Sequence, residues 1–327
     1  MQPRTQWRAV LVPDEGQRAC SSDYFRSEQH LKAEGVTHSL IVEDGEGRAL
    51  RVPLIVRAIE GTRYRDAVSP YGFPGAELNG LSEVPPDAID WRGTELVSIF
   101  VRDRIGGPCC FAGPRLRSEV CLIDSSQPMN FRADHAADIR RNTRLGYVST
   151  YVPAKESTAE QREGLKSVYR QTLARNQAEA RYSFTDAWFE EVFTCGFAWL
   201  VTTRAPDGAI ASSALAVLSD GHLHHFIGGT ADAYLMHSPA KNEYPVLAEL
   251  SAKLEAPVHL GGGLRPGDGI EHFKRGFANA MSHFYTHDLI CDPDVYAELA
   301  RGHEGTDSFP AYRALSLTAA SRRARKG

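Results

Sequence analysis

The sequence predicts an α/β protein made of two units of the same kind. Its 327 residues exceed the usual size of a single domain. Helix-like and strand-like hydrophobic patterns alternate along the chain, and the order of elements in the second half is repeated more loosely in the first. Hydrophobic residues make up 42% and charged residues 24% of the chain, which is typical of globular proteins and excludes disordered or fibrous classes.

In the first half the clearest signal is a hairpin. Two strand-like runs, 39–42 and 50–59, flank the turn sequence Asp44-Gly45-Glu46-Gly47. We further expect a helix near 23–34, strands over 95–101 and 119–123, and a helix over 134–145.

The second half opens with two predicted helices. Ser157 and Glu160 have the spacing of a capping box, and apolar residues then repeat on one helical face, so a long amphipathic helix is expected over 157–180. A second helix carries Trp188, Phe189, Val192 and Phe193 on one face.

Strands and short helices follow. The runs 197–203 and 210–218 flank Pro206-Asp207-Gly208, which predicts a hairpin, and 222–227 is a third strand. Ser238 and Pro239 have the types favoured at the N-cap and first position of a helix, here expected to reach residue 254. The remaining predicted elements are a strand over 258–260, a helix capped by Asp268 and reaching Phe277, a strand over 284–290, and a helix that begins at Asp292-Pro293.

Charge and cysteine content narrow the class of protein. With 37 basic and 41 acidic residues the chain has a net charge of −4, so a polyanion would have to bind a local patch. The candidate patches are Arg132, Arg140, Arg141 and Arg144, and the tail Arg322, Arg323, Arg325 and Lys326, although such runs are usually solvated surfaces. Six cysteines without a C-x-x-C pair, and no apolar run long enough to span a bilayer, predict reduced thiols in a cytoplasmic protein.

A histidine cluster is the one hint of a metal, and it is weak. On a strand, His222 and His224 share a face while His225 points to the other, and no carboxylate has useful spacing. We therefore predict no metal site.

One block of the sequence resembles a known family. Leu260-Gly261-Gly262-Gly263, Asp268-Gly269-Ile270 and Phe273-Lys274-Arg275-Gly276-Phe277 are similar to the L-G-G-G…D-x-L-x-x-F-K-x-G-F pattern of the Fem-type (FemABX-like) transferases. Weaker matches occur in the same order over 69–75, 100–102, 178–184 and 229–241, so the resemblance spans roughly residues 35–300.

The resemblance implies a fold and an activity. Fem-type enzymes have two GNAT-like (acyl-CoA N-acyltransferase-like) units with mixed central sheets flanked by helices. Here it implies an acceptor-side unit over 1–150, a donor-side unit over 151–312 and a basic tail over 313–327. The activity implied is transfer of an amino acid from aminoacyl-tRNA to the amine of a peptide, with no cofactor besides aminoacyl-tRNA.

The sequence departs from the family in two respects that bear on the acceptor. Ser69-Pro70-Tyr71-Gly72 stands where Fem enzymes usually have Arg-Gly-Pro, and the chain has no room for the long helical arm of some cell-wall members. The acceptor is therefore either a peptidoglycan precursor or a peptide of an antibiotic pathway, including peptidyl-nucleoside antibiotics.

Two other functions stay open. An acyl-CoA-dependent N-acyltransferase of the same fold is one, although residues 228–238 lack the glycine pattern of a pyrophosphate loop. A non-catalytic module that binds tRNA or a carrier protein is the other.

The candidate site residues follow from the motifs and from the chemistry. Aminolysis of an ester passes through an oxyanion, which a fixed cation stabilises, and Lys274 is that cation. In the family the matching lysine contacts the aminoacyl end, with the residue matching Phe273 beside it. Asp66 is a weak candidate for receiving the amine proton.

The predicted substrate-binding residues come from both halves of the chain. Ser238 and Lys241, at a helix start, offer an anion site for a tRNA phosphate. Arg102 is suited to pair with an acceptor carboxylate or phosphate, and Tyr71 to line the acceptor pocket. Ser69 and Arg275, which lie within the matched motifs, complete the set.

Overall fold

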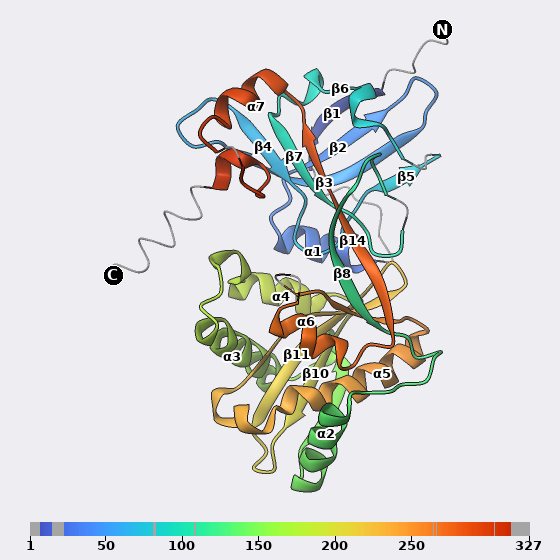
Figure 1. The fold of residues 1–327 in the computed structure, drawn as a ribbon, viewed down its shortest axis with the longest axis vertical. Helices are drawn as coiled ribbons and strands as arrows, with labels where there is room; N and C mark the ends of the chain where they lie inside the picture. The colour runs from blue at the N-terminus through green and yellow to red at the C-terminus, as the bar shows by residue number, and fades with distance from the viewer. Residues whose placement is uncertain are drawn as a thin grey trace. The chain divides into compact units, whose positions relative to one another are not determined.

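The computed structural model describes residues 7–14, 23–80, 83–107, 109–263, 265, 267–303 and 305–314. These residues form an α/β fold in which helices pack on mixed β-sheet, as the sequence predicts (Figure 1). Of the predicted basic tail, residues 315–327 lie outside the described residues. None of the described helices combines the length and the hydropathy needed to cross a bilayer.

The chain folds into two compact units, each assembled from separate segments. Unit 1 comprises 1–17, 35–117 and 285–327, and unit 2 comprises 18–34 and 118–284. Two strands, β8 (Arg115–Ile123) and β14 (Ala280–Ile290), continue from one unit into the other. The predicted boundary after residue 150 lies inside β9 (Val148–Pro153), a strand of unit 2. Compactness thus divides the chain elsewhere, and the division into an acceptor-side and a donor-side segment stays a prediction.

Unit 1 is built on a mixed sheet. Its strand order is β6-β1-β2-β3-β4-β7-β14, with β5 paired to β3. The bounds are β1 Trp7–Pro13, β2 His38–Glu43, β3 Ala49–Ala58, β4 Arg65–Val68, β5 Glu77–Asn79, β6 Ile89–Asp90 and β7 Ser98–Arg102. The pairs β1–β6 and β4–β7 are parallel. The pairs β1–β2, β2–β3, β3–β4, β3–β5 and β7–β14 are antiparallel.

The predicted hairpin of the first half is confirmed as β2–β3. Asp44 fixes its turn, because the carboxylate accepts hydrogen bonds from the backbone N–H groups of Glu46 and Arg48 at 3.0 Å each. Alternate side chains of the two strands, among them Leu40 and Leu50, are fully buried in the core of unit 1. The turn chemistry and the alternation therefore specify the same pairing.

In unit 2 the strand order is β8-β13-β12-β11-β10-β9. The bounds are β10 Ala198–Arg204, β11 Ile210–Ser219, β12 His222–Thr230 and β13 Val258–Gly261. The predicted hairpin of β10 and β11 is confirmed, and β12 pairs antiparallel with β11 and parallel with β13.

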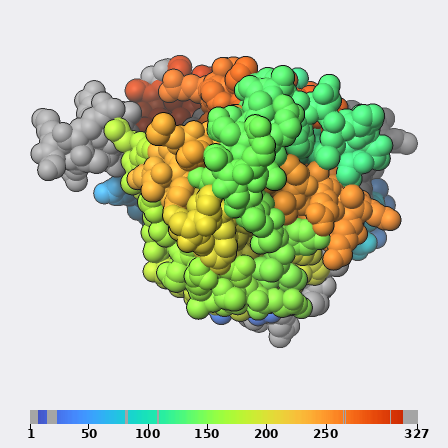
Figure 2. Space-filling model, turned by 90° about the horizontal axis from the view of Figure 1, so that it is seen from below, coloured from blue at the N-terminus to red at the C-terminus, as the bar shows by residue number. Residues whose placement is uncertain are grey.

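Helices α3 and α5 pack on the sheet of unit 2. The α-helices of unit 2 within the described residues are α1 Glu28–Ala33, α2 Ala133–Leu145, α3 Ala159–Arg175, α4 Asp186–Thr194, α5 Glu243–Leu254 and α6 Gly269–Arg275. Helix α3 contacts β11 and β12, whereas α5 contacts β9, β10 and β13 (Figure 1). The four apolar residues predicted on one face of α4 are its buried residues. Helix α2 lies on the surface (Figure 2). It contacts Pro239–Asn242, the segment that carries Lys241 of the predicted anion site.

Two predicted helix starts are wrong in detail. The capping box of α3 is formed by Thr158 and Gln161, one residue later than predicted, because the Ser157 hydroxyl donates instead to the Ala154 carbonyl oxygen at 2.5 Å. Residues Pro239–Asn242 form a short 3-10 helix, and α5 begins only at Glu243.

Helix α7 (Pro293–Leu299) follows β14 in unit 1 and begins where the sequence predicts. The Asp292 side chain accepts a hydrogen bond from the Val295 N–H at 3.1 Å, and Pro293 occupies the first turn. The N-cap and the proline thus act as expected.

Candidate active site

The block from Leu260 to Phe277 forms one local structure in unit 2. Strand β13 ends at Gly261, and α6 begins under the predicted cap, where Asp268 accepts a hydrogen bond from the Glu271 N–H at 2.8 Å. Strands β12 and β13 pair only through Leu223–Val258 and His224–His259, after which their pairing ends. In α/β sheets ligands bind beyond the carboxyl ends of parallel strands, so the end of β13 is the candidate active site.

Lys274 lies at this strand end. Its Nζ donates a hydrogen bond to the carbonyl oxygen of Gly262 at 2.8 Å. Burial lowers the pKa of Lys274 to about 8, although Cys121 and Asp268 oppose the change. The ammonium is therefore held in a fixed position and titrates within reach of neutral pH, a property typical of functional lysines.

The glycines of the block have separate physical reasons. Gly261 has a φ of +77°, and a Cβ atom there would lie 3.1 Å from the Lys274 Nζ. A Cβ atom on Gly276 would lie 2.4 Å from the His135 ring, because α6 approaches α2 closely at this point. Glycine therefore provides backbone freedom at one position and close packing at the other.

Phe273 belongs to an aromatic cluster beside Lys274. Its ring lies 5.2 Å from His135, 5.3 Å from Phe277 and 5.8 Å from Tyr244, measured between ring centroids. Tyr244 and Phe277 stack at 3.7 Å. Because these rings come from α2, α5 and the α6 region, they fix α6 and with it the Lys274 side chain.

The same region holds three buried histidines in their neutral form. Burial lowers the pKa of His135 to about 4, with further lowering by Lys241 and Arg132. Burial also lowers the pKa of His224 to about 3 and of His259 well below its ordinary value, and Lys274 adds to the effect on His259. The Nδ1 atoms of His224 and His259 lie 3.2 Å apart. With a pKa of about 8, Lys274 thus changes its charge nearer to neutral pH than these three histidines do.

The predicted anion site at Ser238 and Lys241 has a different structure from the one expected. Ser238 has a φ of +47° and makes no side-chain cap, so it does not begin a regular helix. Lys241 is 8% exposed, and its Nζ donates to the Asp138 carboxylate at 2.7 Å. A lysine held in a buried ion pair is less available to a phosphate than one at an open helix start.

Arg275, which follows Lys274, is exposed. Its guanidinium pairs with Glu271 at 2.7 Å and with Glu119 at 2.9 Å. Because Glu119 is exposed, its pair with Arg275 can exchange for a substrate anion at small cost.

The four remaining predicted site residues lie in unit 1. Asp66 is fully buried, and its carboxylate accepts hydrogen bonds from Arg57 at 2.9 Å, from Arg313 and from Tyr312 at 3.2 Å. Both carboxylate oxygens of Asp66 are thus already engaged by neighbouring side chains. The geometry therefore favours a structural ion-pair network at Asp66.

Ser69 and Arg102 are joined by hydrogen bonds. The Ser69 Oγ accepts from the Arg102 backbone N–H at 2.9 Å, and the Arg102 guanidinium donates to the Ser69 carbonyl oxygen at 2.7 Å and stacks over the Phe100 ring. Arg102 thus orders the loop that carries Tyr71, which is half-buried.

Sequence reasoning missed His135, Tyr244 and Glu243. Glu243 is buried with an oxygen 3.7 Å from His225 Nε2, and burial raises its pKa. These residues reach the Lys274 region by tertiary packing, so no local spacing identifies them. The glycine of the F-K-x-G-F block was the available signal for His135, since it implies a close neighbour.

The rings of His222 and His224 lie 6.1 Å apart, measured between centroids, as expected for two residues on one face of β12. Among the described residues, one group has the spacing and side-chain types for a metal ion, and it consists of Asp103, Cys110 and His287 in unit 1.

No model of a known protein family matches the sequence, and no curated protein does. Among solved structures, FemX is similar over 80% of this chain and 89% of its own, with a TM-score of 0.55 and 12% identity. The C-terminal domain of a putative lysylphosphatidylglycerol synthetase from Agrobacterium fabrum is similar over 83% of this chain and 88% of its own, with a TM-score of 0.54 and 13% identity. L-PGS from Bacillus licheniformis is similar over 90% of each chain, with a TM-score of 0.50 and 12% identity. Similarity at such identities is similarity of fold, and the chain has the Fem-like α/β fold that its sequence predicts.

Proposed function

We propose that this protein is an aminoacyltransferase that moves an amino acid from aminoacyl-tRNA to the amine of a peptide. The observation that carries the proposal is Lys274, fixed by the Gly262 carbonyl at the end of β13 within the F-K-x-G-F block. The fold is shared with FemX and with a domain of a putative lysylphosphatidylglycerol synthetase. The name of the synthetase states that its product is an aminoacylated lipid. Since aminoacyl-tRNA is made in the cytoplasm, we place the reaction there.

The chemistry asks little of the protein beyond position and charge. The acceptor nitrogen attacks the ester carbonyl carbon, the bond to the ribose oxygen breaks, and an amide bond forms. The amine loses a proton and the ribose hydroxyl gains one. In the tetrahedral intermediate the former carbonyl oxygen is negative, and the protonated Lys274 stabilises it in a partly dehydrated site.

The contacts of the other predicted site residues support their proposed roles to different degrees. Arg275 is exposed and able to exchange partners, so it is our candidate for a tRNA phosphate. Tyr71 and Arg102 remain candidates for the acceptor. Because Ser69-Pro70-Tyr71-Gly72 departs from the Fem pattern, we favour a small or carrier-bound peptide of an antibiotic pathway over a peptidoglycan precursor.

The test charges bacterial tRNA with labelled amino acids and follows label into ribonuclease-resistant products with a panel of peptide and muropeptide amines. We expect transfer that is lost when the tRNA is digested beforehand. Lys274→Ala should lower the rate about 10²- to 10³-fold, the usual effect of removing an oxyanion donor. Lys155→Ala, which removes an exposed lysine of the same unit, is the matched control and should keep the full rate.

Two outcomes would overturn the proposal. Acyl transfer from CoA thioesters, with none from aminoacyl-tRNA, would make the protein an N-acyltransferase of the alternative kind. Retention of aminoacyl-tRNA on a filter without transfer to any acceptor would make it a binding module.

A further inference from the structure

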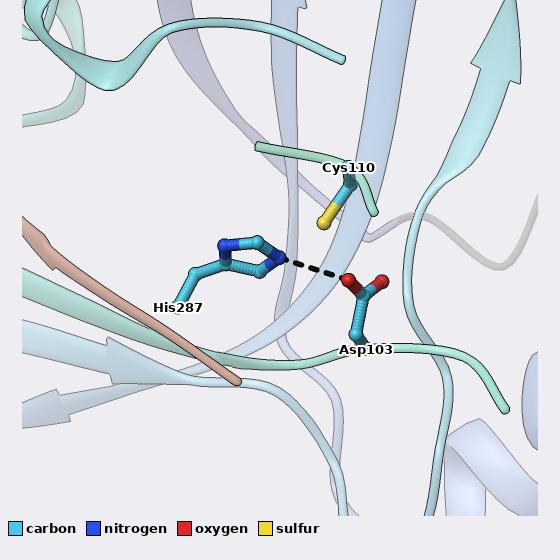
Figure 3. Close-up of side chains that lie close together, drawn as sticks. All are labelled: Asp103, Cys110 and His287. Atoms are coloured by element: carbon cyan, nitrogen blue, oxygen red, sulfur yellow. Dashed lines mark hydrogen bonds and ion pairs between the residues drawn. The ribbon is translucent and has the colours of Figure 1, made fainter. Parts of the chain in front are cut away.

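Three side chains with metal-binding groups meet in the core of unit 1 (Figure 3). Asp103 directly follows β7, Cys110 lies in the segment between β7 and β8, and His287 lies on β14. Each side chain belongs to a residue that is at most 2% exposed. Burial of three such groups at one point is costly unless each has a partner.

Their atoms are close enough for one ion. The His287 Nε2 lies 2.9 Å from the Asp103 Oδ2, and the three candidate ligand atoms all lie within 4.8 Å of one another. Around tetrahedral zinc, with bonds of about 2.0–2.3 Å, ligand atoms lie roughly 3.3–3.8 Å apart. Because the sulfur lies within 4.8 Å of the other two atoms, it has to approach them by no more than about 1.5 Å.

The backbone already holds the three residues in place. The Cys110 carbonyl oxygen accepts from the Val84 N–H at 3.2 Å, and the Asp103 N–H donates to the Tyr285 carbonyl oxygen at 3.0 Å. His287 is opposite Val101 in the β7–β14 pair. Because each position is fixed by strand or bridge hydrogen bonds, little ordering is needed when an ion binds.

Asp103 connects the other two groups. Its carboxylate bonds to the His287 ring, and the Cys110 sulfur lies within 4.8 Å of both ligand atoms. The carboxylate, the imidazole and the thiol are therefore placed to face one cation, which would hold the thiol as a thiolate.

We propose that unit 1 binds one zinc ion through Asp103 Oδ2, Cys110 Sγ and His287 Nε2, and that the ion stabilises the join between β7, the β7–β8 segment and β14. A set of one sulfur, one nitrogen and one oxygen suits zinc, whereas calcium and magnesium prefer oxygen alone. A water molecule would complete the fourth position. The sequence predicts no such site because His287 lies 177 residues after Cys110 in the chain.

The experiment uses the full chain, loaded with zinc and then freed of unbound metal. We expect about one zinc per chain by chelator assay, and, after replacement by cobalt, a near-ultraviolet thiolate-to-cobalt absorption band. Cys110→Ser should abolish the band, and His287→Gln should lower zinc affinity at least tenfold. Cys291→Ser is the matched control, because it removes a different, partly buried cysteine of unit 1. It should keep both the metal and the band.

The wild-type protein decides the matter even if a variant fails to fold. Less than about 0.1 zinc per chain, together with no cobalt–thiolate band and no rise in the melting temperature on adding zinc, would overturn the proposal. A band that persists in Cys110→Ser would also overturn it. No step of the assay depends on transferase activity, so its failure leaves the proposed function untouched.

Discussion

Lys274 combines a fixed position with a lowered pKa. With a pKa of about 8 it is mostly protonated at pH 7 and mostly neutral above pH 9. A side chain that acts through its charge must therefore lose its effect across this range.

This makes the pH profile informative. We expect the single-turnover transfer rate of the wild-type protein to stop rising and then fall as pH increases through about 8, because deprotonation removes the cation. In Lys274→Arg the guanidinium stays charged, so any residual activity should not fall in this range. The rates are measured from pH 6.5 to 9.5 with aminoacyl-tRNA prepared fresh at each pH. The same fall in both proteins would assign it to another group.

Asp66 illustrates the opposite case at this scale. Its sequence position beside the Ser69 loop suggested a proton acceptor, whereas Arg57 and Arg313 hold it in a buried network. The sequence singled out Asp66 but could not identify its ion-pair partners, since Arg313 comes from the far end of the chain.

At the scale of elements, α6 is placed by its contact with α2. The Arg132 guanidinium donates to the His272 carbonyl oxygen at 3.0 Å, and Gly276 abuts the His135 ring. The orientation of Lys274 therefore depends on a helix that begins more than a hundred residues earlier.

A double-mutant cycle tests this contact. Gly276→Ala should destabilise the protein by about 1–3 kcal/mol, the usual cost of overpacking, because the new methyl group collides with His135. His135→Ala should relieve part of that cost in the double variant, giving a measurable coupling in urea unfolding. Gly208→Ala, in the β10–β11 turn where φ is +87°, is a backbone control whose cost should add to His135→Ala without coupling. Additive costs for Gly276→Ala and His135→Ala would contradict the contact.

The sequence predicted the elements with strong periodicity and missed those without it. The hairpins and α4 show clear alternation or a single apolar face, and each was found. Strands β1 and β9 were missed, and β9 has only one half-buried residue between exposed ones in its first half. The capping box was displaced because 157–160 and 158–161 both fit the pattern, and only the Ser157 bond to Ala154 decides between them.

For the site, the block around Lys274 was predicted and its surroundings were not. Local sequence identifies a glycine-rich strand end and a capped helix. The pKa of Lys274 depends on its burial and on Cys121 of β8, and no spacing within the block encodes that packing.

For the whole molecule, net charge limits how tRNA is bound. The net charge of −4 gives the whole chain no attraction for a polyanion, so tRNA has to bind a local basic surface. Of the patch predicted from the sequence, Arg140 and Arg144 of α2 are exposed.

The salt dependence of binding checks this idea. If both arginines contact phosphates, Arg140→Glu/Arg144→Glu should weaken tRNA retention and lower the slope of log affinity against log salt by about 2. Filter binding between 50 and 300 mM salt measures it. Lys155→Glu/Lys253→Glu, which changes the charge equally at exposed positions of the same unit, is the control. An equal loss in both double variants would point to net charge alone.

The path of the chain between the units also affects how the protein folds during its synthesis. Strand β7 ends at residue 102, and its neighbour β14 begins at residue 280, after most of unit 2 has been made. At about 5–20 residues per second, the ribosome releases β14 roughly ten to thirty seconds after β7. During that time one edge of β7 has no partner, and the chain needs either a holding chaperone or a provisional fold of its nascent first half.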